Sequence, residues 1–250
     1  MEWRKRQLWW CVILTWLWSG LAAWSDPPGK TFVEQAYELA KARYQTNSSD
    51  PEAAWQFARA CFDRADNAGK ESVRAATARE GMAACEQALR LKPHLAAAHY
   101  YLGMNQGQLA QTKTFGALAL VKEMERAWRK ARELDEHFDF AGPDRNLAML
   151  YRDAPRAPLS VGHRAKAEEL ALRAVALAPE YPENHLVLLE SYLKWDRWAA
   201  AATADEKLKG MMPAARKQFV GPEWQDDWND WDRRQAAAEK KLRSALERGK

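Results

Sequence analysis

Hydrophobic positions recur along most of the chain with the period of an α-helix, and several segments repeat one order of residues. In each segment a first position is followed four residues later by a second, and three residues after that by a third. The copies are Gly81-Cys85-Ala88, Met124-Trp128-Ala131, Ala167-Ala171-Ala174 and, more weakly, Ala201-Asp205-Leu208. Pro93, Pro179 and Pro213 follow three of them. Because proline cannot continue a helix, the pattern predicts four helices, three of which end near a proline.

A second pattern precedes each of these predicted helices, and its copies also have matching spacing. The four copies are Trp55-x2-Ala58-Arg59-x2-Phe62, His99-x2-Leu102-Gly103-x2-Gln106, Asp144-x2-Leu147-Ala148-x2-Tyr151 and His185-x2-Leu188-Leu189-x2-Tyr192. Together the two patterns resemble the tetratricopeptide repeat (TPR), a pair of antiparallel helices. Small residues in such a pair lie where the helices cross, and large residues fill the space beside the crossing.

The spacing between the two helices of a repeat departs from the family pattern. In a standard repeat the last position of the first helix and the first position of the second lie about nine residues apart. Here Phe62 and Gly81 are 19 apart, Gln106 and Met124 are 18 apart, and Tyr151 and Ala167 are 16 apart. Three repeats therefore carry insertions, in the turn or as longer helices, all on the same edge of the predicted solenoid. That edge is often a working edge in repeat proteins.

Amphipathic segments flank the repeats on both sides. Thr31-x-x-Glu34 is a capping box that opens a helix before the first repeat. After the last repeat, residues 222–248 carry an apolar stripe of Trp224, Trp228, Trp231, Ala238, Leu242 and Leu246, with Asp226, Asp227, Asp230 and Asp232 displaced from it. We therefore expect an all-α fold of roughly ten helices: a TPR-like α-solenoid of about four degenerate repeats over residues 30–213, with a capping helix over 222–249.

The first 25 residues have the order of parts of a secretory signal peptide. A basic segment, Arg4-Lys5-Arg6, precedes an apolar run over residues 8–23, and small residues near Ala23 fit a cleavage site. The alternative is an uncleaved anchor at the inner membrane over residues 8–24, just short of the ~20 residues that span a bilayer. Either alternative places the rest of the chain outside the cytoplasm, and we expect a periplasmic protein.

Composition agrees with a soluble globular fold and narrows the classes of partner. Of the 250 residues 47% are hydrophobic and 29% are charged, which excludes disordered and collagen-like chains. The net charge is +4, and without the first 25 residues it is nearly neutral, with 35 basic against 33 acidic residues. This net positive charge is too small, and the basic residues are too evenly spread, for a nucleic-acid binder. Two cysteines, Cys61 and Cys85, remain in that part, and they either form a disulfide or are buried thiols.

Known catalytic and metal-binding patterns are missing from the sequence. It has no G-x-S-x-G, H-E-x-x-H, G-x-G-x-x-G or Walker pattern, and no Cys/His cluster. His99 and His185 take the large-residue position of their repeats, so we expect them to pack between helices. The sequence thus predicts no enzyme, no cofactor and no metal site.

The resemblance to TPR proteins implies a binding surface on the concave face, lined by first-helix positions that do not face the second helix. In this sequence they include Tyr100, Met104, Gln108, Arg145, Met149, Arg152 and Lys194. An apolar patch beside two guanidinium groups would suit a ligand or peptide with an anionic end and an apolar body. The alternative is that inserted helices cover this face, that Tyr100 and Met104 are ordinary core, and that Arg145 pairs with Asp144 or Asp153.

Two further apolar groups leave alternatives open. Trp195, Trp198, Trp224, Trp228 and Trp231 either form an aromatic wall for a sugar or peptide, or pack the capping helix against the last repeat. The inserted segment 114–121 is apolar enough to line a ligand tunnel, to dock a second subunit in a homo-oligomer, or simply to pack.

The order of parts is similar to the T components of TRAP transporters, which are periplasmic repeat proteins that associate with a solute-binding protein. The resemblance implies an exported scaffold that binds a protein partner and takes part in transport. A second hypothesis is a carrier of a small apolar or amphipathic ligand in a tunnel formed by the inserted helices. An enzyme of unfamiliar type is the third.

Overall fold

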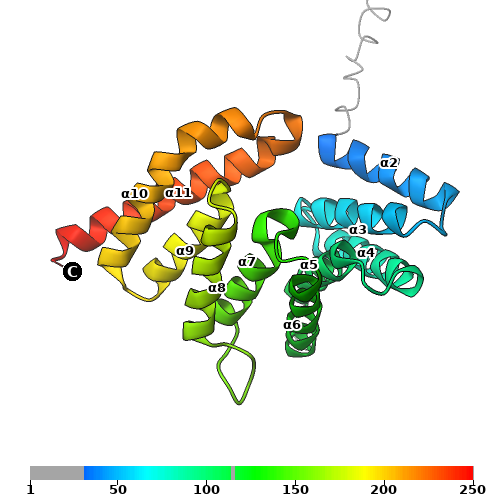
Figure 1. Cartoon of the computed structure of the whole chain (residues 1–250), viewed down its shortest axis with the longest axis horizontal. Helices are drawn as coiled ribbons and strands as arrows, with labels where there is room; N and C mark the ends of the chain where they lie inside the picture. The colour runs from blue at the N-terminus through cyan, green and yellow to red at the C-terminus, as the bar shows by residue number, and fades with distance from the viewer. Residues whose placement is uncertain (1–30, 114–115, 250) are drawn as a thin grey trace, which may run out of the picture. The chain divides into compact units, whose positions relative to one another are not determined.

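The computed structural model describes residues 31–113 and 116–249, and residues 32–250 form one compact unit. The described residues form ten α-helices and one short 3₁₀-helix, in the order shown in Figure 1. These are α2 (Phe32–Thr46), α3 (Pro51–Asp66), α4 (Glu71–Leu91), α5 (Ala96–Gln111), α6 (Ala117–Leu134), α7 (Phe138–Asp153), α8 (Arg164–Leu177), α9 (Pro182–Lys194), α10 (Trp198–Gln218), η1 (Pro222–Trp224) and α11 (Gln225–Glu247). The predicted leader over residues 1–25 lies outside the described residues.

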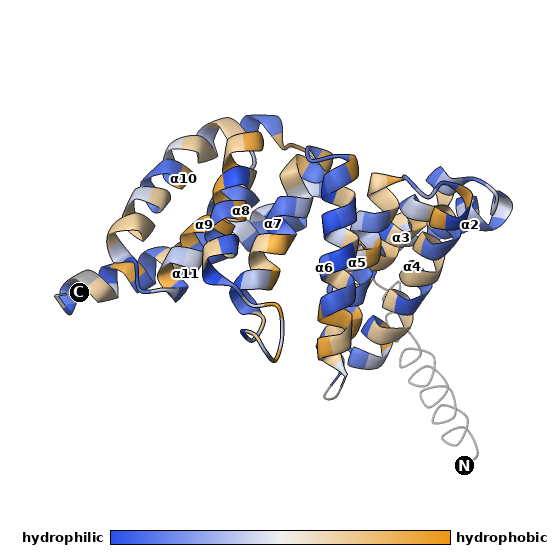
Figure 2. Ribbon diagram, turned by 60° about the horizontal axis from the view of Figure 1, so that its bottom comes forward, coloured by the Kyte–Doolittle hydropathy of each residue, from blue (hydrophilic) through white to orange (hydrophobic). Residues whose placement is uncertain are grey.

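The helices follow one another as antiparallel pairs, which confirms the predicted all-α TPR-like solenoid. The pairs α3–α4, α5–α6, α7–α8 and α9–α10 correspond to the four predicted repeats, with α2 before them and α11 after them. Each second helix also contacts the first helix of the next pair, so that the repeats stack in sequence order. Figure 2 shows both hydrophobic and hydrophilic residues along the helices, as expected where one side is buried and the other faces water.

Close helix crossings explain the small residues of the repeat pattern. A Cβ atom on Gly81 of α4 would lie 2.3 Å from Oδ1 of Asn105, and one on Gly103 of α5 would lie 2.5 Å from Nε1 of Trp128. The Asn105 side chain is completely buried, and its Nδ2 donates to the carbonyl oxygens of Ala58 and Tyr101. It thereby links the first repeat to the second.

In the turns before α5 and α9, a histidine ring contacts the carbonyl group of the proline that the sequence pattern placed there. Nε2 of His99 lies 3.0 Å from the carbonyl oxygen of Pro93, and Nε2 of His185 lies 2.8 Å from that of Pro179. Burial lowers the pKa of both imidazoles, which favours the neutral ring. Both histidines thus join the start of a repeat to the turn before it.

The inserted residues take two different forms. In the first two repeats they lengthen helices, so that α4 has 21 residues and α6 has 18, whereas in the third they form the loop 154–163 between α7 and α8. Within the described part of segment 114–121, Leu120 is buried in a small apolar cluster and Leu118 is exposed. Pro213 does not end its helix: α10 continues through it to Gln218.

The main hydrophobic core is continuous from α2 to α11. Trp228, Trp231, Ala238 and Leu242 of the predicted stripe are buried in it, whereas the side chain of Leu246 lies outside the described part. Cys61 and Cys85 are completely buried and are free thiols, so the disulfide considered above is not formed in the structure. They pack among alanine and aromatic residues as small apolar side chains. None of the described helices is both long and apolar enough to cross a membrane.

The crossing at Gly103 yields a stability prediction with a matched control. Gly103→Ala should lower the free energy of unfolding by about 1–3 kcal/mol, because the new methyl group overlaps the Trp128 ring. Gly210→Ala in α10 meets no atom within 4 Å and should be neutral or stabilising by up to ~1 kcal/mol. Urea denaturation followed by circular dichroism measures both, and equal effects would contradict this packing.

Candidate functional site

A cavity of about 290 Å³ lies on the face formed by the first helices of the repeats, which is the concave face in TPR proteins. Residues of α3, α5, α7, the start of α9 and the segment η1–α11 line it: Arg59, Phe62, Asp63, Asp66, Tyr100, Tyr101, Met104, Asp139, Arg145, Asn146, Met149, Tyr181, Glu183, Trp224, Asp227, Asp230 and Arg234. A second cavity of about 510 Å³ adjoins it, shares six of these residues and is walled by Phe32, Val33 and Ala36 of α2. We call the first the inner cavity, the second the outer cavity and the two together the groove.

Arg145 lines the inner cavity, and both terminal nitrogens of its guanidinium group are bound by the protein. Nη2 forms an ion pair with Asp139 at 2.6 Å and also contacts the Tyr100 hydroxyl at 3.3 Å. Nη1 donates to Oδ1 of Asn184 at 3.0 Å, and the group lies over the ring of Tyr181. Burial alone would lower the pKa of Arg145, but Tyr100 and Asp139 outweigh it and hold the pKa above its ordinary value.

The same guanidinium group stabilises an unusual backbone turn at the start of α7. Asp139, Phe140 and Ala141 have φ values of 50°, 53° and 61°, which place three consecutive non-glycine residues in the left-handed region. Nη1 of Arg145 donates to the carbonyl oxygens of Asp139 and Phe140, and Nδ2 of Asn184 also donates to that of Phe140. These hydrogen bonds offset a conformation that costs about 1–3 kcal/mol per residue.

Four of the predicted concave-face residues come together in the cavity, namely Tyr100, Met104, Arg145 and Met149. The other three do not line it. Gln108 is buried and donates to Asp66, Arg152 pairs with Asp153 and with Glu190, and Lys194 pairs with Asp153. Tyr100 is buried, which agrees with the alternative in which the concave face is covered. It nevertheless lines the cavity, where its hydroxyl donates to Asp139.

The ion-pair partner considered for Arg145 needs correction. Arg145 pairs with neither Asp144 nor Asp153, because the left-handed turn brings Asp139 back to its guanidinium group. Asp144 is completely buried and instead binds Arg132 at 2.6 Å and Arg173 at 2.5 Å, which joins α6, α7 and α8. The expectation of a ligand with an anionic end relied on the guanidinium groups of Arg145 and Arg152. Both groups are in internal ion pairs.

Sequence reasoning missed the acidic side of the cavity. Six carboxylates and three guanidinium groups line it. Burial, with the neighbouring charge of Asp139, raises the pKa of Asp63 to about 6. Burial, with the charges of Glu183 and Asp63, raises the pKa of Asp227 to about 7. The sequence pattern places Asp227 only on the polar side of the capping helix, and its position beside α3 depends on how that helix packs.

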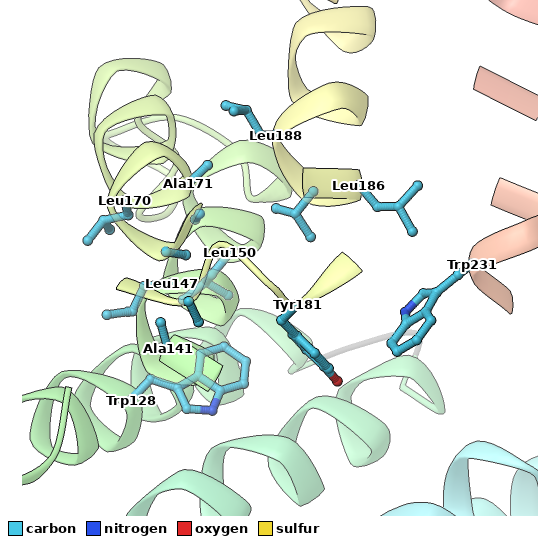
Figure 3. Packing of buried hydrophobic residues seen from close by; sticks show 14 of the residues in the cluster. Trp128, Ala141, Leu147, Leu150, Leu170, Ala171, Tyr181, Leu186, Leu188 and Trp231 are labelled. Carbon is cyan, nitrogen blue, oxygen red and sulfur yellow. The ribbon is translucent and has the colours of Figure 1, made fainter. Parts of the chain in front are cut away.

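The tryptophans divide between packing and the groove. Trp231 is almost completely buried against Tyr181 and Trp228, and its Nε1 donates to Glu183 at 2.9 Å. Figure 3 shows the Trp231 ring beside the ring of Tyr181. Trp224, in contrast, is only half-buried and lines the cavity. Trp228 and Trp231 thus attach α11 to the solenoid, and Trp224 offers an aromatic surface to the groove.

Comparisons with known proteins agree with this architecture. Residues 28–140, less than half of the chain, match the family model of the regulator of microtubule dynamics proteins 1-3. The structure is similar to the crystal structure of a thermophilic TPR protein of Thermus thermophilus, with a TM-score of 0.61 and 18% identity over 82% of this chain and 90% of that chain. A comparison with curated proteins found no match. The structural likeness shows a TPR-like fold.

Substitution of Arg145 should be a stability experiment rather than a binding experiment. Arg145→Ala removes the ion-pair partner of Asp139 and one donor from each of two carbonyl oxygens in the left-handed turn, so we expect a loss of about 3–5 kcal/mol in the free energy of unfolding. Arg129→Ala removes an exposed ion pair with Glu125 and should cost less than about 1 kcal/mol. Urea denaturation measures both, and similar costs for the two variants would show that Arg145 does not organise this region.

Proposed function

We propose that the protein is a non-enzymatic scaffold that binds a segment of a partner protein in the groove. The observation that carries this proposal is the groove itself: it lies on the first-helix face of a TPR-like solenoid, where it is bounded by side chains from α2, α3, α5, α7 and α11. A site assembled from many successive helices suits an extended segment that contacts several repeats at once.

The composition of the groove favours a peptide over a small apolar ligand. Nine of the 17 residues that line the inner cavity are charged. Burial of an apolar ligand among them would remove water from these charges without replacing its hydrogen bonds. A peptide brings its own donors and acceptors and is the better match, so the carrier hypothesis comes second.

Export and a role in transport are the finer parts of the proposal. The order of charges and apolar residues over 1–25 supports an exported, periplasmic protein, either cleaved or held at the inner membrane by residues 8–24. The arrangement of leader, degenerate repeats and terminal helix supports a transport-associated partner, such as a periplasmic solute-binding protein. Expression with the intact leader, followed by fractionation and mass spectrometry of the N-terminus, tests location and cleavage together.

A filled groove should abolish partner binding without loss of the fold. Met149 lines the inner cavity, so Met149→Trp should occupy the space that the partner segment needs and reduce the captured partner by about tenfold or more. Leu172 in α8 is 46% exposed and does not line the groove, so Leu172→Trp is the matched control and should capture as much partner as the original chain.

The measurement is chemical cross-linking in the expressing cell, followed by quantitative mass spectrometry of proteins cross-linked to each variant. Circular dichroism shows whether the variants keep their helix content. A partner that is lost with Leu172→Trp but kept with Met149→Trp would place the interface on the second-helix face and contradict the proposal.

A further inference from the structure

We propose that the inner cavity binds a cationic side chain of the partner segment, the guanidinium of arginine or the ammonium of lysine, between Asp63 and Asp227. This inference deepens the proposed function and depends on it. Three independent observations support it: the charge left over in the cavity, two tyrosine hydroxyls without hydrogen-bond partners in the described part of the chain, and the aromatic and apolar walls.

The first observation is a local excess of negative charge. Arg145 is already paired with Asp139, and Arg234 with Glu183 and Asp230. The remaining carboxylates have little compensation: Asp63 is 3.9 Å from Arg59, and Asp227 forms no hydrogen bond or ion pair within residues 31–113 and 116–249. Within these residues, a cation in the cavity would therefore find one carboxylate without an ion-pair partner, Asp227, and a second, Asp63, that is held only by the long contact with Arg59.

The second observation is a pair of tyrosines, largely buried, that line the inner cavity and whose hydroxyls have no partner among the residues that the structure describes. Tyr101 is 6% exposed and Tyr181 is 7% exposed, both line the inner cavity, and neither hydroxyl forms a hydrogen bond to any described residue. Figure 3 shows the Tyr181 oxygen pointing away from the surrounding leucine and alanine side chains. A bound donor would give each of these hydroxyls a hydrogen-bond partner that no described residue supplies. Ammonium and guanidinium groups carry three and five donors and no acceptor, which suits a site rich in acceptors.

The third observation is the arrangement of apolar surface around these acceptors. Trp224 and Phe62 line the inner cavity, and aromatic rings beside a cation attract it through their negative faces. The adjoining outer cavity is walled by Phe32 and Val33, and Phe32 is 50% exposed. A volume of about 290 Å³ accommodates one long side chain, so the neighbouring residues of the segment would lie in the outer cavity. The preferred segment therefore has an arginine or lysine beside an apolar residue.

The pH dependence of binding follows from the carboxylates. The groups that face Asp227 are Asp63, Asp66 and Arg59 of α3, Asp139 and Arg145 of α7, Glu183 of α9, and Asp230 and Arg234 of α11. With pKa values of about 6 for Asp63 and about 7 for Asp227, both must lose protons before they bind a cation. Affinity for a cation should therefore rise from pH 5.5 to pH 8, and binding at pH 6.5 should release protons.

The test is calorimetric titration of the full chain with two blocked tripeptides, acetyl-Leu-Arg-Leu-amide and the same peptide with citrulline in place of arginine. Citrulline keeps the shape of arginine but carries no charge. We expect the arginine peptide to bind at least about tenfold more tightly at pH 8, with a smaller difference at pH 5.5. Equal affinities for the two peptides, or binding of neither at millimolar concentration, would overturn the inference.

Two variants locate the effect within the site. Asp227→Asn should weaken binding of the arginine peptide by about tenfold, leave the citrulline peptide unchanged and reduce the pH dependence. Asp232→Asn, on the same helix but paired with Arg216 and outside the groove, should change neither affinity. Because folding raises the pKa of Asp227, its neutral replacement should not lower the unfolding midpoint at pH 8. A lower midpoint, or equal effects of the two variants, would contradict the assigned role.

Two further results separate this inference from the proposed function. If the cross-linked partner is lost with Met149→Trp but kept with Asp227→Asn, the groove binds a partner, and the proposal that it binds a cationic side chain is refuted.

Agmatine, a free guanidinium compound, distinguishes the source of the cation. Competition by agmatine at the affinity of the arginine peptide would assign the site to a free organic cation and overturn the peptide assignment. Agmatine binding at least about tenfold weaker supports a side chain on a segment.

Discussion

A guanidinium group that is almost removed from water needs hydrogen-bond acceptors within the protein, and both terminal nitrogens of Arg145 find them on three helices. Tyr100 comes from α5, Asp139 and two carbonyl oxygens from the start of α7, and Asn184 from α9. One side chain thus joins the second, third and fourth repeats and holds a left-handed turn that its own residues would not adopt unaided. The positions of Tyr100, Asp139 and Tyr181 on the wall of the groove depend on this arrangement.

The internal use of Arg145 also sets the charge of the groove. Asp139 balances the positive charge of Arg145 within the wall. As a result, Asp63 and Asp227 face the cavity with little compensating positive charge. Without a ligand, the repulsion and the limited hydration raise the pKa values of both carboxyl groups. The unfavourable free energy of these carboxylates is concentrated in the groove, where a bound partner could remove it. Binding sites commonly give up some stability in this way for the sake of function.

The repeated spacing of small and large residues was enough to predict the helix pairs, because each pair needs small residues at its crossing whatever lies around it. The same register correctly placed Tyr100, Met104, Arg145 and Met149 on one face. It could not identify the partner of Arg145, since Phe140 and Ala141 carry no local signal for a left-handed turn. It also could not place Asp227, because an amphipathic stripe shows which side of α11 is buried but not which helix its polar side approaches.

In the proposed function, the face formed by the first helices binds the partner, and the outer face formed by the second helices does not. Amide hydrogen exchange of the full chain, measured alone and with the cross-linked partner, tests this claim most directly, because it reports on every helix in one experiment. We predict slower exchange on binding in α3, α5, α7 and the segment η1–α11, with α4, α6 and α8 unchanged. Protection confined to α4, α6 and α8 would contradict the claim.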